Sequence, residues 1–268
     1  MRFIVIILFF FLTQICFSQG EKEFTSARNF ALGGASTALV GNINSIDNQG
    51  TLGFLDTNSI SLGYKNDYLL QEFNSFSVST THCSKLGNWG ALFSRFGNTY
   101  YNQNTLGLAY GKKLNNRFGL GVRLNANSVQ QNEYGNVFYP TVELGVFTKI
   151  SDHLQFGAHV YNPFKTKWRA EKNSVRTNAF LRLGINYALQ KAQLLLDFES
   201  NTDQNISVRT GLEYHAATWL DIRFGANFPN KQFSTGIGYR YKTTIIDFYY
   251  QWHVLLGASL GSSISYEF

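Results

Sequence analysis

The chain has 268 residues, of which 16% are aromatic and only 15% are charged, and it contains 24 glycines but three prolines. Many aromatic residues with few charges suit a sheet that faces lipid and carries aromatic girdles at both interfaces. The formal net charge of +6 is spread along the chain, without the clustered Lys, Arg and aromatic residues of a nucleic-acid groove. Composition therefore favours a membrane-embedded β-sheet with no nucleic-acid partner.

Residues 1–18 have the pattern of a cleaved secretory signal peptide. Arg2 is the only charge before an apolar run over residues 3–12, and small residues precede a cut after Ser18. The run is shorter than the roughly 20 apolar residues that a membrane-spanning helix needs. A lipoprotein signal has a small residue before its cysteine, whereas an isoleucine precedes Cys16. The mature chain then keeps Cys83 alone, so we expect no intramolecular disulfide.

Residues 19–57 form a segment of different character, which we expect to fold as a hatch inside a barrel made by the rest of the chain. Its central part is rich in small residues and lacks the alternation of a strand. It has the pattern of short helical turns around a Gly-Gly break. A disordered amino-terminal tail is the alternative. The residues that define the predicted hatch are Ala27, Arg28, Gly33, Gly34 and Asn48.

From about residue 58 onward, apolar and polar residues alternate with the period of two that predicts β-strands. In the last segment, for example, Leu260, Ile264 and Phe268 share one face, and serines share the other. Asn, Gly, Asp and Lys break the alternation about every ten to fifteen residues, as turns do. The predicted strands span residues 58–70, 73–84, 88–97, 104–114, 117–130, 137–150, 153–163, 175–189, 191–201, 205–217, 219–228, 232–242, 243–254 and 258–268.

These segments predict an all-β protein, a transmembrane antiparallel β-barrel of about 14 strands over residues 58–268. Each segment is close to the 9–11 residues with which a tilted strand crosses the hydrocarbon layer. An open sheet edge in lipid would cost several kcal/mol for each unpaired backbone group, so the sheet must close on itself. We therefore expect an exported protein that lies in the lipid of the outer membrane.

Several motifs resemble those of a known family. The pattern Ala-Arg-x-x-Ala-Leu-Gly-Gly-Ala-x-x-Ala runs from Ala27 to Ala38, and residues 48–52 read Asn-Gln-Gly-Thr-Leu where that family usually has Asn-Pro-x-x-Leu. Residues 156–164 and 233–241 also match its strand patterns. On these residues the chain resembles the FadL-type superfamily of outer-membrane barrels, and most closely its PorV/PorQ-like branch, which is associated with type IX secretion.

The resemblance implies a fourteen-stranded barrel whose lumen holds residues near 20–57 as a hatch. It also implies one of two non-enzymatic functions. Uptake of long-chain fatty acids and other hydrophobic compounds is the founding activity of the superfamily. The PorV-like branch instead serves as a partner of secretion machinery.

Charged residues on the polar face of the predicted strands form the main candidate site. Arg or Lys facing lipid near the midplane would cost about 2–4 kcal/mol, so these residues must face the lumen. Neighbouring strands repeatedly offer opposite signs, which lie close enough to pair. We predict an interior ion-pair network that fills much of the bore; solvated charges lining a pore are the alternative. The network residues are Arg123, Glu143, Arg182, Asp197, Glu199, Arg209, Glu213, Asp221, Arg223, Arg240 and Asp247.

Residue patterns for catalysis, metal binding or cofactor binding are missing. The five histidines are too scattered to build a metal site with a second His, Cys or carboxylate. Ser151, Asp152 and His153 supply the residue types of a hydrolytic triad, but adjacent strand positions point to opposite faces. The Gly33–Gly34 pair lacks the lysine and the strand–turn–helix context of a phosphate loop. We therefore expect a protein that is not an enzyme and binds no cofactor.

Two functions remain, an accessory or scaffold subunit of a larger outer-membrane protein complex and a passive transporter of small hydrophobic compounds. A transporter needs an apolar pocket, which such barrels usually build from long extracellular loops. The longest predicted loops, at residues 98–104, 131–137 and 163–174, are short, and the last is basic rather than apolar. The sequence alone therefore favours the scaffold over the transporter.

Overall fold

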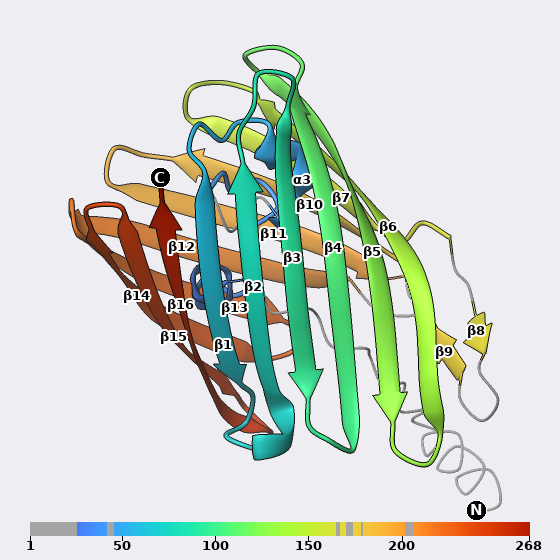
Figure 1. Cartoon of the computed structure of the whole chain (residues 1–268). Helices are drawn as coiled ribbons and strands as arrows, with labels where there is room; N and C mark the ends of the chain where they lie inside the picture. The colour runs from blue at the N-terminus through green and yellow to red at the C-terminus, as the bar shows by residue number, and fades with distance from the viewer. Residues whose placement is uncertain (1–25, 42–45, 165–166, 170–173, 178, 202–205) are drawn as a thin grey trace, which may run out of the picture.

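The computed structural model describes residues 26–41, 46–164, 167–169, 174–177, 179–201 and 206–268; the predicted signal peptide lies outside them. Fourteen antiparallel strands form one closed barrel (Figure 1). The prediction of an all-β barrel with 14 strands is confirmed. Among the described residues, no helix is long and apolar enough to cross a membrane.

Strands that follow each other in sequence pair in the barrel, except that β7 pairs with β10, and β1 closes the barrel against β16. The barrel strands are β1 (Ser59–Asn66), β2 (Asn74–His82), β3 (Asn88–Gly97), β4 (Tyr101–Lys113), β5 (Phe118–Gln131), β6 (Gly135–Lys149), β7 (Leu154–Tyr161), β10 (Phe180–Ala188), β11 (Ala192–Asn201), β12 (Ser207–Ala217), β13 (Leu220–Phe228), β14 (Gln232–Tyr241), β15 (Thr244–His253) and β16 (Gly257–Glu267).

A small hairpin of β8 (Lys167–Arg169) and β9 (Ser174–Arg176) lies in the connection between β7 and β10. The predicted strand over residues 175–189 is therefore wrong at its start. The reason is that β7 ends at Tyr161, which pairs with Phe180. Residues before Phe180 have no barrel neighbour on that side, and part of them pairs with β8 instead.

Two predicted loops are largely strand. The sequence suggested loops at residues 98–104 and 131–137, but β4 begins at Tyr101 opposite Gln131 of β5, and β6 begins at Gly135. Asn and Gln are abundant here and favour turns, yet their backbone groups pair in register. As a result β4, β5 and β6 have 13, 14 and 15 residues, and Figure 1 shows them as long arrows.

The barrel wall is apolar outside and polar inside. On β16, Leu260 and Ile264 are exposed while Ser263 and Ser265 are buried in the lumen. The same alternation recurs on the other strands, because successive side chains of a strand point to opposite faces. An outward apolar face over a polar interior is the pattern of a barrel in lipid.

The two ends of the barrel differ in the length of their connections. Near the carboxyl terminus, β12–β13 and β14–β15 are joined by two-residue turns at 218–219 and 242–243. The opposite end carries the long connection of residues 162–179. Since transmembrane barrels have short periplasmic turns and longer extracellular loops, we name the end with Phe268 the periplasmic end and the other the extracellular end.

The amino-terminal segment lies inside the barrel, where it forms the hatch, defined as residues 26–41 and 46–57 (Figure 1). Its helix α2 (Ala27–Ala31) contacts β13 to β16, and its helix α3 (Gln49–Leu52) contacts β3 to β7. A short 3-10 helix, η2 (Gln71–Phe73), lies outside the hatch in the β1–β2 connection. The two hatch helices therefore contact different parts of the wall.

Candidate functional site

Local capping interactions fix the shape of the hatch. The side chain of Ser26 accepts a hydrogen bond from Arg28 N and caps α2. Gly33 and Gly34 follow with φ of 66° and 82°, values that favour glycine, and turn the chain. Asn48 caps α3, since its side chain accepts from Gly50 N at 3.0 Å.

Glycines on the lumen face of the wall let the hatch backbone come very close. A Cβ atom on Gly145 would lie 2.3 Å from Asn48 Oδ1, and one on Gly225 would lie 2.0 Å from Gly33 N. No side chain fits at such distances. We call this set the glycine belt; its members are Gly111, Gly119, Gly121, Gly145, Gly157, Gly184, Gly211, Gly225 and Gly236.

The first cluster of charges surrounds Glu143 of β6, which is buried. Arg123 Nη2 donates to Glu143 Oε1 at 2.5 Å, and the two residues are direct cross-strand neighbours. Glu143 Oε2 accepts from Gln49 of α3 at 3.2 Å and lies 2.9 Å from His159 Nε2. Arg123 Nη1 also donates to the carbonyl of Ile46 at 3.1 Å. This pair therefore holds the hatch as well as the wall.

The second cluster lies on β10 to β12. Glu199 accepts hydrogen bonds from Arg182, its cross-strand neighbour, and from Arg209 Nη2 at 2.6 Å. Arg209 stands opposite Asp197 in the register, but its Nη2 atom donates to Glu199 instead. One carboxylate thus joins two guanidinium groups across three strands.

Asp197 instead binds the hatch. Its Oδ2 atom accepts from the backbone N–H groups of Ser36 and Thr37, both at 3.0 Å, and from Thr37 Oγ1 at 2.7 Å. On the other side of this turn, Ser36 Oγ donates to Asp47 at 3.1 Å, and Asn29 donates to the same oxygen. Two carboxylates therefore hold one buried turn of the hatch, and hydrogen bonds to a charged acceptor are the stronger kind.

The third cluster surrounds Glu213 of β12, which is fully buried. Arg28 of α2 donates to its two oxygens at 2.5 and 2.8 Å, and Arg223 Nε donates at 2.6 Å. Arg223 Nη1 reaches past β14 to Asp247 at 2.6 Å, and its Nη2 lies 3.3 Å from Asp221. The opening past β14 exists because Gly238 has no side chain there.

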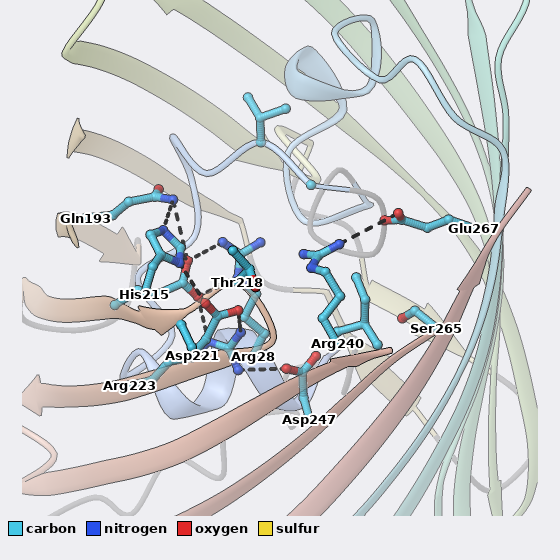
Figure 2. A pocket seen from close by; sticks show the side chains of 15 residues that line it. Arg28, Gln193, His215, Thr218, Asp221, Arg223, Arg240, Asp247, Ser265 and Glu267 are labelled. Carbon is cyan, nitrogen blue, oxygen red and sulfur yellow. Dashed lines mark hydrogen bonds and ion pairs between the residues drawn. The ribbon is translucent and has the colours of Figure 1, made fainter. Parts of the chain in front are cut away.

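A polar cavity of about 400 Å³ opens beside this cluster, near the periplasmic end (Figure 2). Arg240 lines it and lies 3.8 Å from Glu267, but the Arg240 side chain is 45% exposed. His215 lines the other side, with Nδ1 2.7 Å from Asp221. Arg240 therefore differs from the other predicted network residues, because it is the one at the solvated mouth.

Of the eleven predicted lumen residues, the structure groups nine into three clusters, while Asp197 binds the hatch and Arg240 lies apart at the solvated mouth. Sequence reasoning missed two hatch residues, Asp47, which accepts from Ser36 and Asn29, and Gln49, which donates to Glu143 of the wall. It also missed the glycine belt. The available signal was that glycines occur at lumen-facing positions of strand after strand, as Gly111, Gly121 and Gly145 do in register.

The outer wall carries an apolar hollow of about 460 Å³ over β14, β15, β16 and β1. Large outward side chains, Tyr64, Ile237, Phe248, Tyr250 and Leu260, surround it, and small residues form its floor. On the lumen side of the same wall, Tyr249 packs on Phe30 of the hatch, with ring centroids 5.5 Å apart. Apolar groups therefore lie on both faces of this stretch of wall.

Several solved channel structures have a similar fold. A mutant of the monoaromatic hydrocarbon channel TodX matches with a TM-score of 0.70 and 12% identity, over 91% of this chain and 99% of that chain. The toluene transporter TodX of Pseudomonas putida matches with a TM-score of 0.69 and 12% identity, over 92% and 98% of the two chains. A FadL homologue of Pseudomonas aeruginosa has a TM-score of 0.65 and 12% identity, over 91% and 97%.

No protein-family model matches the chain, and no curated protein matches it. At 12% identity, the likeness to the solved channels establishes a shared barrel fold, that of FadL-like outer-membrane channels. These structural neighbours are channels rather than enzymes. The likeness to the PorV/PorQ branch stays a prediction from the sequence motifs.

Proposed function

We propose that this protein is a passive outer-membrane channel for small hydrophobic compounds. The observation that carries the proposal is the likeness in fold to monoaromatic hydrocarbon channels, which extends over about nine tenths of the chain. This proposal differs from the sequence analysis, in which the short loops favoured the scaffold over the transporter. An outer-membrane location fits both the barrel and its apolar outer face.

The apolar hollow adds support for the substrate class. Its volume of about 460 Å³ is within the roughly 300–1,000 Å³ of small-molecule pockets, and large apolar side chains surround it. The charged lumen gives little apolar contact to such a compound. We therefore assign the hollow, rather than the polar cavity beside Glu213, as the place where a hydrophobic compound meets the wall.

The first test is uptake by cells that lack their own channel for such compounds. Cells that express the protein should take up a labelled monoaromatic compound several-fold faster than cells with an empty vector, and sucrose no faster. Ser262→Phe fills the hollow from its floor and should reduce the rate. Ala126→Phe, at an outward position on β5, is the matched control and should leave the rate unchanged. Equal uptake with and without the protein contradicts the proposal.

An accessory or scaffold subunit of a larger outer-membrane protein complex is the second candidate. The short connections favour it, since apart from residues 162–179 the extracellular connections between described strands have at most seven residues (67–73). Extraction from native membranes in mild detergent separates the two proposals. A large stoichiometric partner supports the scaffold; a monomer that carries a bound hydrophobic compound supports the channel.

A further inference from the structure

Strands β4, β5 and β6 are longer than a membrane crossing requires. They have 13, 14 and 15 residues, whereas about 9–11 suffice for a tilted strand. The additional length lies at the extracellular end, because β6 pairs with β7 only from Glu143 to Lys149 and residues 135–142 continue past the end of β7. At roughly 3.3 Å per residue, three to five extra residues bring this rim out of the hydrocarbon layer.

The outward side chains change character along these strands. Outward residues that are cross-strand neighbours on β3 to β6 form rows, taken here in order toward the extracellular end. The first row is apolar. The second has two polar side chains between Arg95 and an aromatic ring, and the third consists mainly of amides. These rows, read from the strand register, are Phe93, Leu106, Ala126 and Pro140; then Arg95, Asn104, Ser128 and Phe138; then Gly97, Asn102, Gln130 and Asn136.

The polar side chains of the upper two rows form a hydrogen-bonded ladder. Asn104 Nδ2 donates to Asn102 Oδ1 at 2.9 Å and to Ser128 Oγ at 3.3 Å, and Asn102 Nδ2 donates to Gln130 Oε1 at 3.4 Å. The ladder leaves the amide N–H groups of Gln130 and the hydroxyl proton of Ser128 unused among the described residues. Asn102 is buried, so the surface offers the donors and acceptors of Asn104, Ser128 and Gln130 side by side.

Charge and aromatic rings complete this surface. Arg95 Nη1 lies 3.5 Å from Asn104 Oδ1 and is the cation of the ladder. Phe138, beside Ser128 in the register, is 73% exposed, and Tyr100 at the neighbouring turn is 70% exposed. We call Arg95, Asn104, Ser128, Gln130 and Phe138 the amide face; Asn102, which is 2% exposed, supports it through hydrogen bonds to Asn104 and Gln130.

The opposite side of the same rim is different. At the extracellular ends of β13, β14 and β15 the outward residues are Phe228, Phe233 and Trp252, all large, aromatic and exposed. Those strands have 9 or 10 residues, so they end within the hydrocarbon layer or at its border. The amide face is therefore a local feature and not a general property of the rim.

We propose that the amide face binds the sugar headgroup of a glycolipid in the outer leaflet. Sugar hydroxyls are donors and acceptors at once, as the ladder is, and an exposed aromatic ring packs against the apolar face of a pyranose. Arg95 is placed to pair with a phosphate or carboxylate on the sugar. The face continues directly from an apolar row of the lipid-facing wall, so acyl chains below and a sugar above fit one lipid molecule.

The test measures glycolipid bound to the purified, folded barrel by native mass spectrometry, with rough lipopolysaccharide as the probe. Asn104→Ala/Gln130→Ala and, separately, Phe138→Ala should each lower retention about tenfold relative to the unchanged protein, the effect of 1.4 kcal/mol. Phe233→Ala on the opposite rim is the control and should keep it. The heat-dependent gel mobility of a folded barrel shows that each variant has folded.

Two comparisons identify the source of the binding. Phosphatidylethanolamine, which has no sugar, should be retained equally by all four proteins. The oligosaccharide released from the same lipopolysaccharide should compete only weakly, because it lacks the acyl chains that the apolar row contacts. Equal glycolipid retention by the unchanged protein and both amide-face variants overturns the proposal, as does equally tight binding of the phospholipid by the same face.

Discussion

The two helices of the hatch are held by different physical means. Around α2 the hatch supplies a buried charge of its own, since Arg28 and Arg223 share Glu213. Helix α3 has no charged residue; it donates the Gln49 amide to Glu143 and packs closely where Gly145 leaves room at Asn48. Close backbone approach occurs at both helices, so the two differ in whether the hatch itself adds a charge. Each half should therefore fail under a different kind of substitution.

The largest effect is expected from Glu213→Gln. This change leaves two buried guanidinium groups without their shared carboxylate, and breaking a buried pair costs about 3–5 kcal/mol. The free energy of unfolding in urea, measured in lipid vesicles, should fall by that amount. Glu267→Gln at the solvated mouth is the control, with an expected loss below about 1 kcal/mol. Equal losses of unfolding free energy in the two variants would contradict the role of the buried charges around Glu213 in holding α2.

A smaller loss is expected from Asp197→Asn, because the hatch turn at Ser36 and Thr37 loses its charged acceptor. Hydrogen bonds to charged groups contribute about 1.5–3 kcal/mol, and the amide keeps part of this. We expect a loss of about 2 kcal/mol and a higher leak of small sugars in a vesicle-swelling assay. If the free energy of unfolding falls but the leak of sugars does not increase, this turn stabilises the protein without keeping the lumen closed.

For the α3 half, Gly145→Ala should destabilise by about 1–3 kcal/mol, the usual cost of overpacking. The added methyl would lie 2.3 Å from Asn48 Oδ1, so the hatch must move. Increased protease cleavage within residues 46–57 would report that movement. Gly90→Ala is the matched control, since its nearest atom would be 3.5 Å away. Unchanged protease cleavage in Gly145→Ala would show that the barrel wall moves instead of the hatch.

The smallest effect is expected from Asn48→Ala. It removes the cap of α3 and the hydrogen bonds from Asn48 Nδ2 to the carbonyls of Thr37 and Val146, 2.6 and 3.0 Å away. Loss of an N-cap costs about 1 kcal/mol. Asn48→Ser keeps a capping oxygen but loses both amide donors, so the difference between the unfolding free energies of the two variants isolates the contribution of the cap.

Much of the fold could be predicted because a barrel in lipid forces period-two alternation. Outward positions such as Leu260 and Ile264 must be apolar, so the strands are visible in the sequence. The same rule failed for residues 98–104 and 131–137, where the strands leave the hydrocarbon layer and outward positions such as Asn104 become polar. Polar residues on both faces look like a loop even when the backbone is paired.

The site was less predictable because its contacts connect distant parts of the chain. Arg28 and Glu213 are 185 residues apart, and nothing in either segment identifies the other as its partner. Cross-strand neighbours such as Arg123 and Glu143 were accessible, because adjacent strands pair in order. Glycines recur at lumen-facing positions of neighbouring strands, but only the position of the hatch explains why no side chain fits there.

The position of the hatch also constrains how the protein reaches its folded state. Ala27 N of the hatch donates to Ser263, 236 residues later, and Ser61 on the first strand donates to Ser265 on the last, 204 residues away. Contacts of such long range are slow to form, since a large loop must close before they contribute. The barrel therefore cannot close one strand at a time while the chain is made, because the first residues of the hatch bind the last strand. The hatch must lie inside the barrel when β1 pairs with β16.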